Sequence, residues 1–228
     1  MIDSIALSRL LQLASPMLPV GAYSYSQGLE WMVEEGTVHD AASAEQWIGD
    51  VLKYSMCGFE LPILLRLCHA WQEDNAAGIQ HWNDVLCAGR ETAESRAETL
   101  QMGYSLSRLL ESLAEGTQPP QIAKIQGLTA KSFPAVYACA VAIWQIPVLA
   151  AVQAYAWSWI ENQVSAAMKT IPLGQVAGQR MLLSLGNRLP ALVELASKLE
   201  DTELSNFTPG LALAFCKHET QYSRLFRS

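Results

Sequence analysis

The stretch Ser132–Ile160 reads SFPAVYACAVAIWQIPVLAAVQAYAWSWI and contains no charged residue. It is long enough to cross a lipid bilayer, which takes about 20 apolar residues in one helix. Pro147 interrupts the stretch, glutamines lie within it, and much of its apolar character comes from alanine, which inserts weakly into membranes. We therefore predict a pair of buried helices at 134–145 and 148–170, with a membrane span as the alternative.

Apolar residues recur at helical spacing along nearly the whole chain. In the first helix, Leu7, Leu10 and Leu11 share one face, Ser4 is the expected cap and Pro16 the expected stop. Further helices are predicted at 43–57, 60–73, 76–88, 91–115, 134–145, 148–170, 173–186, 189–200 and 209–220. No alternating strand pattern or internal repeat is present, so we predict an all-α, single-domain bundle of about ten helices over 1–228. The segment 116–120, GTQPP, is interpreted as a loop within this bundle.

Two S-x-x-Q spacings predict helix starts, because each side chain can bond the other's backbone N–H. They are Ser24 with Gln27, in the segment SPMLPVGAYSYSQGLE at 15–30, and Ser43 with Gln46. Gly36 is the expected end of the helix that follows the first pair.

The serines of this segment are weak candidates for a catalytic nucleophile. Neither Ser24 nor Ser26 lies in a G-x-S-x-G motif, and no strand precedes them. A helical hydrolase that uses one of them stays an alternative, but it needs a histidine and an acid that the sequence does not place.

The composition excludes several other classes of function. The net charge is −7 and no block of Lys or Arg is present, which excludes the basic footprint of a nucleic-acid-binding protein. Neither G-x-x-x-x-G-K-[ST] nor G-x-G-x-x-G occurs, so hydrolysis of nucleotides by this chain alone is not expected. Five scattered cysteines and the lack of a signal-peptide pattern at the N-terminus predict a cytoplasmic protein with reduced thiols. No metal site is expected, and Cys216 and His218 are the weak candidates for one.

The densest polar cluster is the segment 90–98, in which Arg90, Glu94 and Glu98 recur every fourth residue. Three interpretations stay open: a solvated helix face, a polar network inside a helical core, and arginines presented to a partner.

Along the predicted helix 91–115 the apolar stripe changes direction. It runs through Ala93 and Ala97, then shifts to Leu106 and Leu110. This shift predicts either a kink near Gly103 or a central helix buried on two sides, which is the simpler interpretation.

The C-terminal run KHETQYSRLFRS, at 217–228, has one lysine and two arginines against one glutamate, a net charge of +2 in an acidic chain. Tyr222 and Phe226 would share a face if the run were helical. Alternating aromatic and arginine residues are typical of interfaces, whereas a frayed terminus is the usual alternative. Composition alone leaves both open.

Four blocks together resemble the UreF family of urease accessory proteins. In chain order they are LLQLASPMLPVGAYSYSQGLEWMVEEGTV, RETAESRAETLQMGYSLSRLL, NQVSAAMKTIPLGQVAGQRML and KHETQYSRLFRS. The resemblance extends from about residue 7 to residue 228, and one departure from it is Ala22, where a glycine is expected.

The resemblance implies an all-helical homodimer without an enzymatic site or a tightly bound cofactor. Family members bind a second accessory protein, UreD (also called UreH), and recruit the nickel-carrying GTPase UreG to apo-urease. Nickel and a carbamylated lysine are then installed in urease. The resemblance leaves open whether the GTPase is accelerated or gated, and whether nickel travels through a water-filled passage in the complex.

The resemblance also implies which residues contact partners. They are Glu30, Arg90, Glu94, Arg96, Lys169, Gln175, Gln179, Arg180, His218, Glu219, Tyr222, Arg224 and Phe226. The tail 217–228 is expected to bind the UreD-type partner, and Lys169 with the polar residues around it is expected to face the GTPase.

Overall fold

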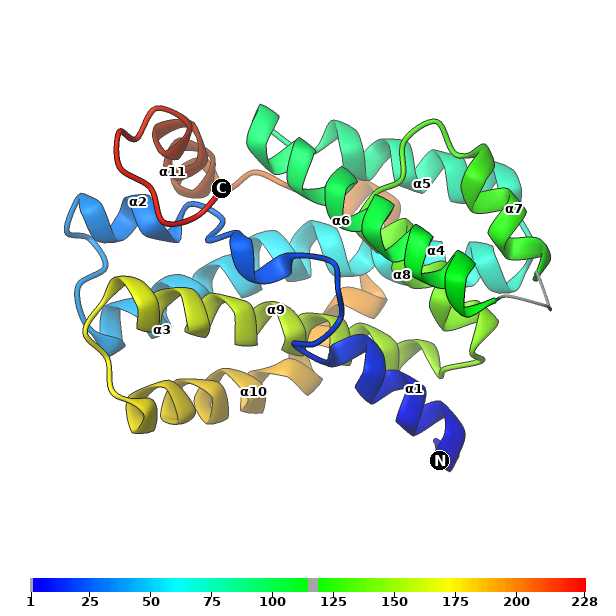
Figure 1. The fold of residues 1–228 in the computed structure, drawn as a ribbon, viewed down its shortest axis with the longest axis horizontal. Helices are drawn as coiled ribbons and strands as arrows, with labels where there is room; N and C mark the ends of the chain where they lie inside the picture. The colour runs from blue at the N-terminus through cyan, green and yellow to red at the C-terminus, as the bar shows by residue number, and fades with distance from the viewer. Residues whose placement is uncertain (1, 115–118) are drawn as a thin grey trace.

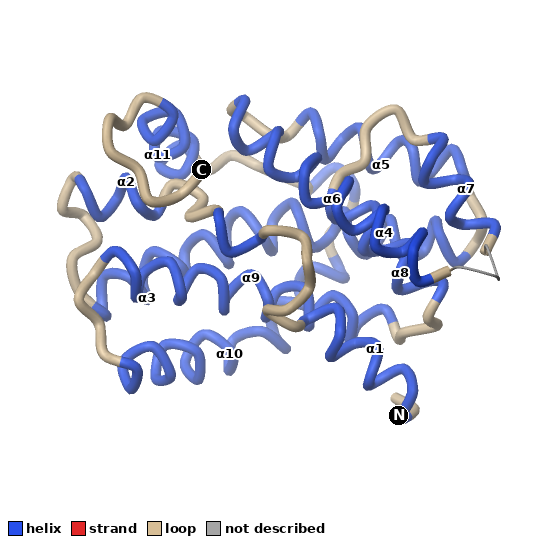
Figure 2. The backbone as a smooth tube through the Cα atoms, in the orientation of Figure 1, coloured by secondary structure: helices blue, strands red, loops and turns tan. Residues whose placement is uncertain are grey.

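The computed structural model describes residues 2–114 and 119–228 and confirms the predicted all-α class, since no strand occurs among these residues. Figure 1 shows the helices gathered around one core, and Figure 2 shows the loops that join them. The α-helices are α1 Ser4–Ala14, α2 Leu29–Glu34, α3 Ala41–Val51, α4 Leu61–Gln72, α5 Ala76–Ala88, α6 Ala93–Leu113, α7 Pro120–Gly127, α8 Phe133–Ile143, α9 Val148–Thr170, α10 Gln175–Lys198 and α11 Pro209–Glu219. Short 3₁₀ turns at Ala22–Ser24 and Asp201–Glu203 and a π-helical segment at Leu52–Glu60 complete the set. Sequence periodicity missed α7, and positions 115–118 of the predicted helix end and loop lie outside the described residues.

The apolar stretch at 132–160 forms the centre of the molecule, and the predicted pair of buried helices is confirmed. Ser132 caps α8 by accepting a hydrogen bond from the Ala135 N–H, and every residue of 134–141 is buried. α8 packs against α4 and α6, while α9 packs against α1, α4 and α10. Among the described helices, none has the length and the apolarity that crossing a membrane requires.

Two predicted helix breaks are wrong. The helices expected at 173–186 and 189–200 are the single helix α10, which contains Pro190. Leu185 and Leu189 before the proline and Val193 after it all lie in the core, and this shared burial stabilises a continuous helix across the missing N–H.

The second wrong break lies between α3 and α4. The π-helical segment Leu52–Glu60 joins the two helices, so the chain is helical without interruption from 41 to 72. Leu52, Met56 and Leu61 are buried at this junction, so the core contacts continue through it.

The predicted helix caps are also corrected, because aspartate side chains take their place. Asp3 rather than Ser4 caps α1, and Asp40 caps α3 in a reciprocal pair with Ser43. In that pair Ser43 is the third helical residue rather than the cap, so the predicted pairing with Gln46 is wrong. An ionised carboxylate at this position accepts the exposed N–H groups of a helix start and also favours its positive end.

The start of α2 differs most from the prediction. Its N-terminal residue follows Gly28, which has a left-handed φ of 79° and has no side chain to act as a cap. The Ser26 hydroxyl instead accepts from the Glu30 N–H at 3.3 Å. Ser24 and Gln27 therefore form no reciprocal cap. The predicted stop is confirmed, since Gly36 has a φ of 85° and its N–H donates to the Val33 carbonyl oxygen.

Helix α6 is continuous through Gly103, and its buried stripe begins with polar residues. Ala93 and Ala97, the expected apolar start, are exposed, so burial on two sides is wrong. Ser95, Glu98 and Thr99 are buried in their place and continue into Met102 and Leu106. The sequence pattern failed here because the polar residues have distant partners that bury them.

Replacing Gly103 with alanine is expected to destabilise the fold. A Cβ there would lie 1.9 Å from the Lys131 carbonyl oxygen, so the loop before α8 would have to move. We expect a loss of at least about 1–3 kcal/mol in the free energy of unfolding, measured by chemical denaturation. Gly127→Ala is the matched control, because nothing lies within 4 Å of its added Cβ. Equal stability of the two variants would show that the loop before α8 can move without lowering the free energy of unfolding.

Candidate partner-binding site at the C-terminal segment

The C-terminal segment, residues 217–228, comprises the end of α11 and an irregular run that lies along α2 (Figure 1). The helix ends at Glu219, so the prediction that Tyr222 and Phe226 share a helical face is wrong. The run is nevertheless fixed by the core: Phe226 is 6% exposed and Ser228 is fully buried. A frayed terminus is therefore not what the structure shows.

The segment from Gly21 to Gly28, expected to open a helix, instead forms hydrogen bonds with the end of the C-terminal segment. The Ser228 main-chain oxygen accepts from the backbone N–H groups of Ser26 (2.6 Å) and Gln27 (3.0 Å) and from the Ser26 hydroxyl (2.7 Å). The Arg227 N–H donates to the Ser24 carbonyl oxygen at 2.8 Å. Ser24 and Ser26 thus bind residues that lie some 200 positions later in the sequence.

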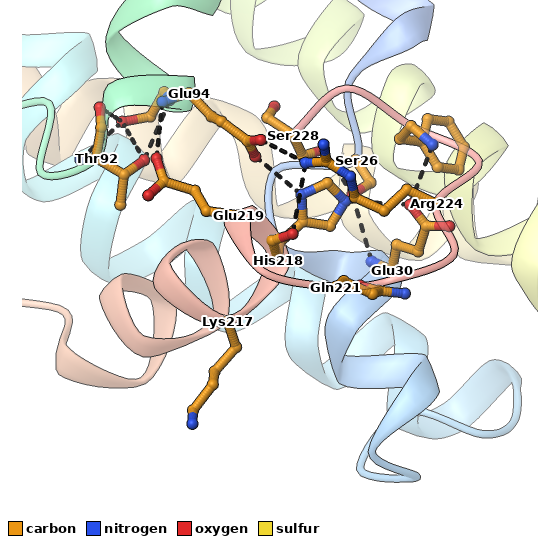
Figure 3. Close-up of polar contacts among 12 residues, drawn as sticks. Ser26, Glu30, Thr92, Glu94, Lys217, His218, Glu219, Gln221, Arg224 and Ser228 are labelled. Atoms are coloured by element: carbon orange, nitrogen blue, oxygen red, sulfur yellow. Dashed lines mark hydrogen bonds and ion pairs between the residues drawn. The ribbon is translucent and has the colours of Figure 1, made fainter.

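His218 lies at the centre of the site (Figure 3). Its side chain is 0% exposed and reaches carboxylates from two other helices. Nε2 lies 3.1 Å from Glu30 Oε2 on α2, and Nδ1 lies 3.0 Å from Glu94 Oε2 on α6. One imidazole therefore joins α2, α6 and α11.

Glu30 also binds the backbone of the irregular run. Its Oε1 accepts from the Leu225 N–H at 2.6 Å and its Oε2 from the Phe226 N–H at 3.1 Å. The carboxylate is buried in the first turn of α2. It thus replaces the hydrogen bonds that this non-helical backbone would otherwise make with water.

Glu94 holds the other side of the segment. Its Oε1 forms an ion pair with the Arg224 guanidinium, and its backbone N–H donates to Glu219 Oε1 at 3.0 Å. Lys217 points away from this cluster (Figure 3). The network of Glu30, Glu94, His218, Glu219 and Arg224 is called the terminal cluster below.

A second polar network lies deeper in the bundle. Arg90 forms an ion pair with Glu60 at 2.5 Å, and the Tyr155 hydroxyl donates to the same carboxylate. Burial, followed by the neighbouring Glu60 charge, holds the pKa of Tyr155 well above its usual value. Burial likewise raises the pKa of Glu98, which accepts from Gln27 Nε2 and the Ser228 hydroxyl.

The deeper network borders a pocket of about 80 Å³, which Glu60, Arg90 and Glu98 help to line. Arg90 Nε and Asn162 Oδ1 belong to residues that line it, and neither atom has a hydrogen-bond partner among the described residues. A pocket of this size has room for a few ordered water molecules, which these unpaired polar atoms could bind.

The structure brings some of the predicted partner-binding residues together and separates others. Glu30, Glu94, His218, Glu219 and Arg224 form the terminal cluster, and Lys169 Nζ lies 5.5 Å from the centre of the Phe226 ring that packs beside it. Tyr222 projects from the segment and is fully exposed.

The remaining predicted residues lie elsewhere. Arg90 belongs to the buried network, so the interpretation of segment 90–98 as a solvated face is wrong. Arg96 is exposed and donates to the Cys87 carbonyl oxygen at 3.3 Å. Gln175, Gln179 and Arg180 are exposed at the start of α10, and no polar contact joins them to the terminal cluster within the described part of the chain.

Metal ligation at the weak candidate residues finds no support in the geometry. Both ring nitrogens of His218 face carboxylates, and Cys216 is exposed. Over residues 2–114 and 119–228, no group of three His, Cys, Asp or Glu side chains is placed to hold a metal ion. Likewise, neither Ser24 nor Ser26 hydrogen-bonds a histidine in these residues.

Sequence reasoning missed several residues of the site. Ser26 and Gln27 bind Ser228 at the end of the segment, and Glu60 pairs with Arg90. The sequence did point to Glu98, which recurs with Arg90 and Glu94 at every fourth residue. A polar network inside the core was one interpretation of that spacing. Glu60, the partner of Arg90, carries no such signal, because it lies in an apolar run 30 residues before Arg90.

Comparison with known proteins gives a consistent result. A family model described as UreF matches residues 38–186. The urease accessory protein UreF of Methylobacillus flagellatus is 56% identical over 100% of both chains, and that of Azoarcus sp. is 56% identical over 98% of this chain and 96% of its own. A bifunctional urease accessory protein UreEF of Bordetella bronchiseptica is 47% identical over 100% of this chain and 53% of its own length. The matched blocks, the all-helical fold and these full-length identities together show that the chain belongs to the UreF family of urease accessory proteins.

Proposed function

We propose that this chain is a cytoplasmic, non-enzymatic scaffold that binds a UreD-type accessory protein and recruits a UreG-type GTPase to apo-urease for nickel insertion. The observation that carries the proposal is the geometry of the C-terminal segment. Its backbone and charged groups are fixed by the terminal cluster, while Tyr222 and the 65% exposed Leu225 project outward. A rigid backbone that presents exposed aromatic and aliphatic side chains is typical of a binding surface.

The polar groups of this surface act as supports rather than as reactants in the proposal. Each carboxylate of Glu30 and Glu94 already accepts from two or three donors, and His218 is enclosed between them. Such groups position a backbone, and they leave no free general base at the surface. In this proposal nickel is cargo of the assembled complex, and no cofactor is resident in this chain.

A second surface is proposed to face the GTPase. Lys169 at the end of α9 and Gln175, Gln179 and Arg180 at the start of α10 are exposed polar residues close together in sequence. Arg90 is committed to Glu60 inside the bundle, which argues against its use as an arginine supplied in trans to the GTPase. We therefore favour gating of the GTPase by assembly, and we propose that the scaffold works as a homodimer.

Tyr222→Ser is expected to weaken binding of the UreD-type partner at least tenfold, because exposed aromatic residues on a fixed backbone contribute strongly to binding. The side chain touches no described hydrogen-bond partner, so the fold should be unchanged. Affinity is measured by titration of the purified partner, with restoration of nickel-dependent urease activity as a second readout. Phe207→Ser changes another highly exposed aromatic residue, outside the segment; it is the control and should bind normally. Normal binding by Tyr222→Ser together with weak binding by Phe207→Ser would place the surface elsewhere.

A further inference from the structure

We propose that the pocket beside the deeper network binds a small uncharged molecule of the primary-amide class, which accepts from Arg90 Nε and donates to Asn162 Oδ1. Tyr222 does not line this pocket, and the site does not rest on the proposed function. The evidence is the pairing of hydrogen-bond groups along the pocket wall.

The pocket is lined by half-buried and by fully buried residues. Leu18, Ala22 and Tyr23, in the segment before α2, are half-buried. Thr99 on α6 and Tyr137 on α8 are 4% and 1% exposed. The pocket therefore extends from near the surface into the bundle. Its volume of about 80 Å³ has room for about five non-hydrogen atoms, since one water-sized site takes about 10–15 Å³.

Several polar side chains of the pocket wall already have partners within the protein. The hydroxyl groups of Tyr137 and Ser158 donate to main-chain carbonyl oxygens of α9. The Trp159 indole N–H donates to Gln27 Oε1 at 2.6 Å. These groups fix the shape of the wall and leave the recognition of a ligand to other atoms.

The two atoms that stay unpaired have opposite hydrogen-bond roles. Arg90 Nε carries a hydrogen and can only donate. Asn162 Nδ2 donates to the Tyr25 carbonyl oxygen at 3.0 Å, which fixes the orientation of the amide and leaves Oδ1 as an unpaired acceptor. Asn162 is only 5% exposed, and a buried polar atom without a partner is unfavourable. A ligand with one acceptor and one N–H donor would satisfy both atoms.

The charges of the wall favour an uncharged ligand. Arg90 is paired with Glu60 at 2.5 Å, and Glu98 accepts from Gln27 and Ser228. These described residues therefore offer no unpaired charge to balance that of a ligand, and burying an unbalanced charge is strongly unfavourable. Burial also raises the pKa of Glu98, which favours its uncharged form.

The apolar part of the wall favours an organic molecule over water alone. The rings of Phe133, Tyr155 and Trp159 line the pocket. Small-molecule sites commonly combine such aromatic walls with a few polar groups. A primary amide offers a carbonyl oxygen to Arg90 and an NH₂ group to Asn162, and its carbon atoms bury apolar surface against the rings.

Titration of the ¹⁵N-labelled full-length chain with acetamide, followed by NMR, tests this proposal. The Trp159 indole N–H is the reporter, because its ring lines the pocket. We expect a saturable shift with a Kd of about 1–10 mM, as befits so small a ligand. Acetone lacks the N–H donor and should bind at least tenfold more weakly, and charged acetate should give no saturable shift. Equal binding of the three, or no saturable shift with acetamide up to about 100 mM, would overturn the proposal.

A pair of variants tests the polar contact itself. Asn162→Leu removes the acceptor oxygen and should weaken acetamide binding at least tenfold. Asn187→Leu changes an exposed asparagine on α10 and is the matched control, which should bind acetamide as the unmodified chain does. Unchanged binding by Asn162→Leu would contradict the proposed contact.

The comparison of the three ligands on the unmodified chain decides the matter if Asn162→Leu fails to fold, since that variant also loses its bond to Tyr25. All of these measurements use the chain without partners. Their outcome is therefore independent of whether Tyr222 binds a UreD-type protein.

Discussion

Glu30→Gln is expected to release the C-terminal segment from the body of the protein. The variant keeps the size of the side chain but replaces one acceptor oxygen with an NH₂ group. In either orientation of the amide, this NH₂ group cannot accept from one of the two backbone N–H groups that Glu30 binds, that of Leu225 or that of Phe226. It also leaves the buried His218 with a single carboxylate partner. A buried backbone N–H left without an acceptor costs about 1–3 kcal/mol, and the segment loses this bond together with a contact to His218. The segment should therefore undock while the helical bundle stays folded.

Limited proteolysis with trypsin measures this release, because Arg224 and Arg227 lie in the irregular run. We expect cleavage after these residues to accelerate at least tenfold in Glu30→Gln, with an unchanged helical circular-dichroism signal. Glu34→Gln, an exposed change on the same helix, is the matched control and should be cleaved like the unmodified chain. Slow cleavage in Glu30→Gln would mean that contacts of Phe226 and Ser228 suffice to hold the segment.

Arg90→Met is expected to destabilise the whole bundle rather than the segment alone. The change leaves the Glu60 carboxylate buried with only the Tyr155 hydroxyl to stabilise its charge. Breaking a buried pair in this way costs about 3–5 kcal/mol. Chemical denaturation should therefore show a large fall in the free energy of unfolding, with a single transition.

Arg108→Met is the control for Arg90→Met, because it removes an arginine from the exposed pair with Glu111. Exposed pairs contribute about 0–1 kcal/mol, so the stability should change little. The same comparison tests the alternative role of Arg90 as an arginine supplied to a GTPase. If Arg90→Met kept its stability and lowered partner-stimulated GTP hydrolysis by about 10³ or more, the catalytic role would be favoured over the structural one.

The sequence predicted the helices well wherever local pattern decides the structure. The pair at 134–145 and 148–170 was found because a charge-free stretch with a central proline favours two buried helices over one span. The stop at Gly36 was found because a left-handed φ favours glycine. The resemblance then selected all five members of the terminal cluster before any contact was known.

Tertiary structure decided the features that local pattern predicted wrongly. Pro190 does not end its helix, since core residues on both sides of it are buried against neighbouring helices. Ser24 and Gln27 form no cap because their segment instead bonds residues 227 and 228. Helix propensities and caps differ between the possible conformations of a short segment by only about 1 kcal/mol. Burial against a partner distant in sequence can outweigh such differences.

By itself, the sequence determined the fold class, most helix positions and, through its resemblance, the family. Only the tertiary structure decided that Glu98 is buried, that Arg90 pairs with Glu60, that residues 220–228 leave the helix, and that His218 lies between Glu30 and Glu94. The physical reason is the range of the interactions. Helix periodicity is set within a few residues, whereas the hydrogen bonds from Glu30 and Glu94 to the C-terminal segment join groups 124 to 196 residues apart. These pairs exist only once the chain is folded.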